Sequence, residues 1–180
     1  MTGVRLRQWQ DGDLERFAEM NADPEVMRWF LRTASAAESE AMMERFRTDI
    51  DRRGWGVWAV EIDRKFAGFT GLYEPSFTAA FTPCVEIAWR FRLEYWGRGI
   101  AFEAARQAED FAFGELGLAE LVSFTTQGNL RSRRLMERLG FSRNPADDFL
   151  HPAVPAGHPL IRHVLYRKTG RTAGPGEHRS

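Results

Sequence analysis

The sequence predicts a single α/β (α+β) domain, built on a mixed, mostly antiparallel central sheet with helices on both faces. In the second half of the chain, strand-like and helix-like segments alternate, as they do in layered proteins. In the middle, two strand-like segments joined by a tight connection predict an antiparallel hairpin, and a third strand-like segment follows a loop that contains Pro75 and Pro83. The chain has 180 residues, the size of one ordinary domain. We expect the domain to span residues 1–169 and a flexible tail to span residues 170–180.

The first part of the chain predicts a strand followed by helices. Apolar and polar residues alternate over residues 4–9, as in a half-buried strand. An acidic start and an apolar face predict a helix within residues 11–23. Asp23 followed by Pro24 is typical of a helix cap with proline at the first helical position, so a short second helix is expected to follow.

A capping box predicts the start of the next helix. Ser35 and Glu38 have the spacing at which each side chain caps the backbone of the other, so we expect a helix from Ala36 to about Arg52. The strands of the middle region come next, and they are rich in β-branched and aromatic residues. They are expected at residues 55–62, 65–73 and 85–91.

The second half of the chain predicts two helices between strands. Apolar residues at helical spacing indicate an amphipathic helix from about Arg98 to Leu116. A later helix has Asn129 as its N-cap and Gly140 as its left-handed C-cap. The remaining strands are expected at residues 118–126, from Phe141 onward, and at residues 160–168.

Composition narrows the classes of function. Lys and Arg total 25, and so do Asp and Glu, which makes the formal net charge zero. Because a dedicated nucleic-acid binder needs a basic excess against phosphate, we expect no nucleic-acid partner. No apolar run approaches the roughly 20 residues that span a bilayer, so we expect no membrane partner either.

The cysteine content bears on the compartment. Cys84 is the only cysteine, which excludes an internal disulfide and a cysteine-based zinc site. A lone thiol is typical of a reducing compartment, and residues 1–17 lack the apolar core of a signal peptide. We therefore expect a cytoplasmic protein, either a monomer or a homodimer.

The segment WGRGIA, at residues 96–101, has two interpretations. Gly97 and Gly99 either form a strand-to-helix turn that needs backbone freedom, or expose N–H groups at a helix start that bind an anion. A P-loop would need Lys and Ser or Thr after the second glycine. A dinucleotide fingerprint would need a small residue at the position of Phe102. Neither of these two anion motifs fits.

The order of the motifs resembles the GNAT acyltransferase superfamily. The motifs are a strand, Gly-x-Gly-x-Ala, an amphipathic helix, a strand, Asn-x-x-Ser, a helix and Leu-Gly-Phe, and they extend from Val4 to about Lys168. Trp96 replaces the more widespread Gln or Arg, as in the branch of the ribosomal-protein N-terminal alanine acetyltransferases. The resemblance implies an acetyl-CoA-dependent N-acetyltransferase. Its acceptor would be a primary amine, on a protein N-terminus or a small molecule, that attacks the thioester directly.

The resemblance also assigns residues to the binding of acetyl-CoA. Backbone amides of the glycine loop and helix start would hold the pyrophosphate, at Arg98, Gly99, Ile100, Ala101 and Phe102. Asn129 would contact the pantetheine arm or the substrate in addition to capping its helix. Arg131, Arg133 and Arg134 either meet the 3′-phosphate or form a solvated helix face.

The chemistry needs a base for the amine and a proton for the departing thiolate. Glu86 is the candidate base, and its alternative role is a structural ion pair with Arg90. The family's usual tyrosine position holds Met136, which cannot donate a proton. Ser132 is therefore the candidate acid, and its alternative is an exposed helical serine. Trp29 and Phe30 are expected to contact the acceptor.

Two alternatives remain. Met136 in place of tyrosine favours a non-catalytic acyl-CoA-binding module that keeps the fold. A metal site is conceivable in the loop that holds Asp147, Asp148, His151, His158 and His163, but their spacing matches no ligand pattern, and we expect no metal.

Overall fold

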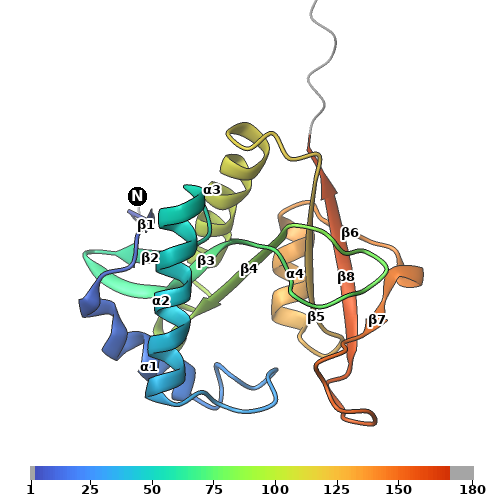
Figure 1. The fold of residues 1–180 in the computed structure, drawn as a ribbon, viewed down its shortest axis with the longest axis horizontal. Helices are drawn as coiled ribbons and strands as arrows, with labels where there is room; N and C mark the ends of the chain where they lie inside the picture. The colour runs from blue at the N-terminus through green and yellow to red at the C-terminus, as the bar shows by residue number, and fades with distance from the viewer. Residues whose placement is uncertain (1–2, 171–180) are drawn as a thin grey trace, which may run out of the picture.

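A computed structural model describes residues 3–170, and Figure 1 shows how their elements are arranged. Eight strands in this part of the chain form one sheet in the order β1-β2-β3-β4-β5-β8-β6, with β7 paired to β8. All described pairings are antiparallel except that of β4 with β5. The strands span Arg5–Arg7 (β1), Val57–Ile62 (β2), Lys65–Tyr73 (β3), Glu86–Phe91 (β4), Glu120–Thr126 (β5), Ser142–Arg143 (β6), Phe149–Leu150 (β7) and Arg162–Thr169 (β8). The predicted mixed, mostly antiparallel sheet is confirmed.

Helices cover both faces of the sheet, as predicted. They are α1 (Leu14–Ala22), α2 (Ala36–Arg53), α3 (Ile100–Gly114) and α4 (Leu130–Arg138), with short 3-10 turns at Asp11–Asp13, Leu93–Tyr95 and Pro145–Asp147. The core beneath α1 and α2 gathers Trp9, Phe17, Met43, Phe66 and Phe69. The core beneath α3 and α4 gathers Ile87, Ala105, Met136 and Tyr166. No helix in residues 3–170 is both long enough and apolar enough to cross a bilayer.

Local sequence signals account for the long helix α2. The Ser35 hydroxyl accepts a hydrogen bond from the Glu38 N–H at 3.2 Å, and the Glu38 carboxylate accepts one from the Ser35 N–H at 2.8 Å. The helix ends at Gly54, whose φ of 76° is left-handed. The predicted capping box and the predicted end near Arg52 are therefore confirmed.

The prediction of a short helix after Asp23-Pro24 is wrong. The Asp23 carboxylate does cap this segment, because it accepts the N–H groups of Glu25 and Val26 at 2.8 and 3.3 Å. One α-helical hydrogen bond follows, from Met27 N–H to Asp23 O at 3.0 Å. The next hydrogen bonds span only three residues, as they do in turns. The segment is a series of turns, since its aromatic residues are drawn to the sheet, as described below.

The C-terminal third differs from expectation in detail. The strand expected from Phe141 is only the two-residue β6, and the loop after it contains the short strand β7, which was not predicted. The long last strand is confirmed as β8. The tail expected from Gly170 lies, apart from that glycine, outside the described residues.

The parallel strands β4 and β5 separate. They share one paired position, Glu86 with Val122, supported by a hydrogen bond from Ser123 Oγ to Ile87 O at 2.9 Å. Beyond it β4 and β5 diverge toward their carboxyl ends, and Figure 1 shows β4 running away from β5 below this point. The helices α3 and α4 begin just after these ends. A split therefore opens in the sheet with two helix N-termini beside it, the position at which α/β sheets bind ligands.

Candidate functional site

The first turn of α3 has backbone N–H groups without partners. The first helical hydrogen bond runs from Glu103 N–H to Gly99 O at 3.1 Å, so the N–H groups of Ile100, Ala101 and Phe102 precede it. No other described residue accepts from them. The neighbouring helix α4 differs, because the Asn129 side chain accepts from the Ser132 N–H at 3.2 Å. The start of α3 is thus left uncapped.

The glycines before α3 leave space in front of these amides. Gly97 and Gly99 have φ values of 72° and 77°, a left-handed backbone that glycine adopts without steric cost. A Cβ atom built at either position would meet no atom within 4 Å. The segment is therefore both a turn that requires glycine and an open approach to the helix N-terminus, and the two interpretations of its sequence are compatible.

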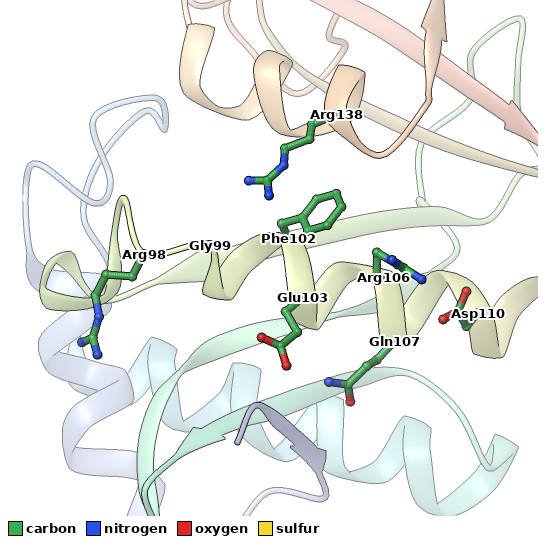
Figure 2. A pocket seen from close by; sticks show the side chains of 8 residues that line it. All are labelled: Arg98, Gly99, Phe102, Glu103, Arg106, Gln107, Asp110 and Arg138. Atoms are coloured by element: carbon green, nitrogen blue, oxygen red, sulfur yellow. The ribbon is translucent and has the colours of Figure 1, made fainter. Parts of the chain in front are cut away.

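An open pocket of about 500 Å³ runs along α3 from this loop. It is lined by Arg98, Gly99, Phe102, Glu103, Arg106, Gln107, Asp110 and Arg138, as Figure 2 shows. The guanidinium of Arg138, from α4, lies over the Phe102 ring at 4.0 Å from its centroid. The Arg98 side chain points away from Arg138 and instead lies near the ring of Tyr95. Arg98 can thus offer the pocket its backbone N–H but not its charge.

Arginines on one face of α4 approach the loop before α3. Arg131, Arg134 and Arg138 are spaced three and four residues apart, which places them on one side of the helix. Arg131 lies over the Trp96 ring at 4.2 Å, so this side faces the glycine loop. Arg133 belongs to another side, because it donates to Gln127 O at 3.0 Å and to the Tyr166 hydroxyl at 3.3 Å.

The structure thus separates Arg133 from the expected group of Arg131, Arg133 and Arg134 and adds Arg138, which sequence reasoning missed. The signal that could have found Arg138 is its spacing of seven residues from Arg131, two helical turns.

Asn129 and Ser132 lie at the N-terminus of α4, beside the split. The Asn129 amide donates to Thr125 Oγ1 at 3.0 Å while its carbonyl oxygen caps the helix, so the protein itself holds both ends of this side chain. The Ser132 hydroxyl has no hydrogen-bond partner among the described residues and is partly buried. Met136 is 1% exposed and packs in the core between α4 and the sheet.

Glu86 begins β4 and lies opposite Tyr73 of β3, at the point where β4 and β5 are still paired. It is 3% exposed, and its Oε2 atom has no hydrogen-bond partner in the described residues. Burial raises the pKa of this carboxyl well above its ordinary value, and the neighbouring Tyr73 hydroxyl offsets part of that rise. The alternative role, an ion pair with Arg90, is not found. Arg90 donates instead to Asn21 Oδ1 at 2.7 Å.

The turns between α1 and α2 reach across the split. Phe30 is 47% exposed, and its ring lies 4.3 Å from the Arg90 guanidinium on β4. Trp29 lies against Gly128, in the loop between β5 and α4, so closely that a Cβ atom there would be 2.8 Å from Cζ3 of the indole. The two expected acceptor-contacting residues thus meet opposite sides of the split.

An aromatic cluster borders the same face of the sheet on the β5 side. It consists of Phe77, Phe81, Phe124, Phe149, His151 and His163. The two imidazole rings are 4.8 Å apart. Burial lowers the pKa of His163 to about 4 and also lowers that of His151, so both rings are neutral near pH 7. Across residues 3–170, no three potential metal-ligand side chains come together, in this loop or elsewhere.

Comparisons with known proteins agree with this arrangement of loop, split and helices. Residues 4–142 match the family model described as an acetyltransferase (GNAT) domain. The chain belongs to the GNAT acetyltransferase family. The prediction of a GNAT acetyltransferase is thereby confirmed at the level of the family.

Curated relatives of this GNAT chain include enzymes whose names indicate different acceptors. One is an FsC-acetyl coenzyme A-N(2)-transacetylase of Aspergillus fumigatus, 30% identical over 133 residues, which cover 69% of this chain and 56% of that protein. The chain thus matches little more than half the length of this relative. Another is the spermidine N(1)-acetyltransferase of Escherichia coli, 26% identical over 77% of this chain and 73% of that protein.

Solved structures share the fold. A Vibrio cholerae spermidine N-acetyltransferase, solved with CoA and spermine, has a TM-score of 0.71 at 20% identity, with 92% of this chain and 95% of that chain covered. A Vibrio fischeri ribosomal-protein-S5-alanine acetyltransferase has a TM-score of 0.75 at 15% identity, with 97% of both chains covered. At these identities the likeness extends to the fold of this GNAT chain and not to its acceptor.

Proposed function

We propose that the chain transfers the acetyl group of acetyl-CoA to a primary amine of a small molecule. The observation that carries the proposal is the uncapped start of α3, whose free amides face open space beside the arginines of α4. Backbone N–H groups at a helix N-terminus bind anionic phosphate, and two glycines without side chains let it approach. The residues present therefore fit the pyrophosphate of acetyl-CoA.

Each part of the split has a role in this proposal. The amides of Arg98 to Phe102 hold the pyrophosphate, and Arg131 and Arg138 supply positive charge beside it. Asn129 fixes the start of α4 at the other edge of the split. Acetyl-CoA supplies the acetyl thioester, whose carbonyl carbon forms a bond to the amine nitrogen as the carbon–sulfur bond breaks.

Two proton movements complete the transfer. The amine must lose a proton, and the ionised form of Glu86 is proposed to accept it, because a carboxylate with a raised pKa is a stronger base than an ordinary one. The CoA thiolate must gain a proton, and Ser132 is proposed to donate it, since its hydroxyl has no partner among the described residues. Met136 is buried in the core and has no acidic proton to offer.

The small-molecule acceptor is favoured over a protein N-terminus. The turns that carry Trp29 and Phe30 bridge the split and leave less room for a polypeptide. Trp96, the residue that suggested the ribosomal-protein branch, has a role here that does not depend on the acceptor. Its indole N–H donates to Phe91 O at 2.8 Å, and its ring lies against Arg131.

The alternative is a non-catalytic acyl-CoA-binding module, favoured by Met136 at the usual tyrosine position. A thiol-release assay with acetyl-CoA over a panel of primary amines separates the two functions. Release that depends on an amine and is slowed by Glu86→Gln supports the transferase. Tight binding of acetyl-CoA with no release above background for any amine supports the module.

A further inference from the structure

The guanidinium of Arg90, on β4, is fixed in place by a chain of hydrogen bonds. Its Nη1 donates to Asn21 Oδ1 at 2.7 Å. Asn21 is fully buried, and its amide donates to Ser39 Oγ at 3.1 Å, while the Ser39 hydroxyl donates to Ser35 O at 3.0 Å. Hydrogen bonds through Asn21 of α1 thus connect Arg90 to the N-terminus of α2 and fix its orientation.

This cation has no counter-ion in residues 3–170. Arg90 forms no ion pair there, and its buried Nε has no hydrogen-bond partner. Its neighbours are the rings of Phe30 and Phe69, at 4.3 and 5.2 Å. Burial lowers its pKa to about 10, which still leaves it charged near pH 7.

Arg7 shows how this protein treats a buried arginine that has a structural role. It pairs with Asp13 and with Glu61, each at 2.7 Å. Burying a charge without such partners costs free energy. Arg90 has no carboxylate partner of this kind, so we expect its anion to come from outside the described chain.

Arg90 shares its face of the sheet with two more unpartnered polar groups. Glu86 is four residues earlier on β4, so its side chain points to the same side. Thr126 is four residues after Val122, the partner of Glu86 on β5, and therefore also lies on this side. Glu86 Oε2, Arg90 Nε and Thr126 Oγ1 are all buried without partners in the described residues. Buried polar atoms are normally bonded, so three on one face indicate a place where a polar ligand binds.

We propose that Arg90 binds an anionic group of the acceptor, so that the acceptor is an amino-acid-like molecule with a carboxylate at some distance from its reactive amine. The inference rests on the proposed function, because it takes the amine to react near Glu86. Four residues of strand place the Cα atoms of Glu86 and Arg90 about 13 Å apart, and their side chains leave the same face of the sheet. When a hydrogen bond of about 3 Å at each end is subtracted, about 7 Å remains between the amine and the carboxylate of the acceptor. An ω-amine on an extended side chain, such as that of free lysine, fits this span.

A polyamine does not fit equally well, since its second ammonium group would face the guanidinium. The like charges would repel in a region shielded from water, where such repulsion is strong. This acceptor class therefore differs from that named for the spermidine relatives.

The test compares free lysine with cadaverine, which has the same amine and chain but lacks the carboxylate. We expect wild-type kcat/KM to be at least tenfold higher for lysine, mainly through KM. Arg90→Gln should raise KM for lysine by tenfold or more and lower KM for cadaverine, whose second ammonium group no longer faces a cation. Its affinity for acetyl-CoA should stay unchanged. Arg90→Lys should restore part of the loss. The assignment is overturned if cadaverine or spermidine matches lysine in the wild type, or if Arg90→Gln weakens both amines alike.

A binding measurement keeps this inference separate from the transferase proposal. If no amine releases CoA, lysine and cadaverine are titrated into the protein saturated with CoA. Lysine binding that is lost in Arg90→Gln supports the anion site while the proposed activity fails. Absent lysine binding, or equal binding of the two amines, overturns the anion site.

Discussion

The guanidinium carbon of Arg138 lies 4.0 Å from the centroid of the Phe102 ring, and this contact joins the last turn of α4 to the first turn of α3. Arg131, two turns earlier on α4, makes the equivalent contact with Trp96, at 4.2 Å from the ring centroid. An aromatic ring in the loop before α3 and another in the first turn of α3 thus hold two arginines beside the free amides of the helix. A charge that stacks on a ring keeps its N–H groups available for phosphate.

Removing one of these arginines should weaken the binding of acetyl-CoA. We expect Arg138→Ala to raise the Kd by about tenfold, since a charged hydrogen bond contributes about 1.5–3 kcal/mol. The effect should shrink at high salt, because exposed charges are screened. Titration calorimetry at two salt concentrations measures it. Arg52→Ala, at the exposed end of α2, is the control for net charge, and an equal loss of affinity there would contradict a local role.

The buried carboxyl of Glu86 should make stability depend on pH. Its pKa is raised in the folded protein, so the stability it contributes is present below the ordinary Glu pKa and is lost as the pH rises through the folded value. Glu86→Gln removes this dependence. Its free energy of unfolding relative to wild type should therefore increase as the pH rises above the ordinary Glu pKa, as measured by urea unfolding.

Glu40→Gln, at an exposed position of α2, is the control for loss of a carboxylate. A constant difference between Glu86→Gln and wild type over this pH range would show that burial does not raise the pKa of Glu86.

Close backbone approach between β2 and β3 should make Gly71 intolerant of a side chain. A Cβ atom there would lie 2.2 Å from Gly56 O and 2.5 Å from Val57 Cα. Neither atom can move without shifting a strand, so Gly71→Ala should cost at least about 1–3 kcal/mol. Gly12→Ala, where nothing lies within 4 Å, should stay within about 0.5 kcal/mol of wild type. Thermal unfolding of both variants tests this prediction. Similar melting temperatures for the two variants would contradict the claim that the backbone of β2 leaves no room for a side chain at Gly71.

The ion pair between Lys168 and Glu109 should stabilise the contact of α3 with β8. The Lys168 ammonium donates to the Glu109 carboxylate and to Leu139 O at 2.6 Å, and Glu109 is 8% exposed. Lys168→Met leaves this carboxylate buried and alone, which should cost about 3 kcal/mol. Adding Glu109→Gln should recover part of the loss. Chemical unfolding of the single and double variants gives the coupling, and additive losses would contradict the pair.

Features that depend on neighbouring residues could be predicted from the sequence. The capping box of Ser35 and Glu38 and the uncapped glycine turn before α3 are both set by local backbone chemistry. The turns after Asp23 were predicted as a helix, because the local signal was right but was overridden by contacts far away in sequence. Phe30 packs on Arg90 and Trp29 on Gly128, and a continuous helix would not present both rings in this way.

The contacts of the candidate site that were not predicted join segments that are far apart in the sequence. Tyr73 meets Glu86 only through the register of β3 with β4. Arg138 reaches Phe102 only because α4 packs beside α3, and Arg90 is held by Asn21 across 69 residues of sequence.

The most direct test of the account is calorimetric titration of acetyl-CoA into wild type, Gly99→Leu and Gly117→Leu. Gly117, beyond the other end of α3, has a φ of 62° and equally open space, so it carries the same backbone strain without the loop. The account predicts micromolar binding to wild type and Gly117→Leu, no binding of NAD, and at least a tenfold loss in Gly99→Leu. Unchanged affinity in Gly99→Leu, or an equal loss in Gly117→Leu, would contradict the binding of pyrophosphate at the start of α3.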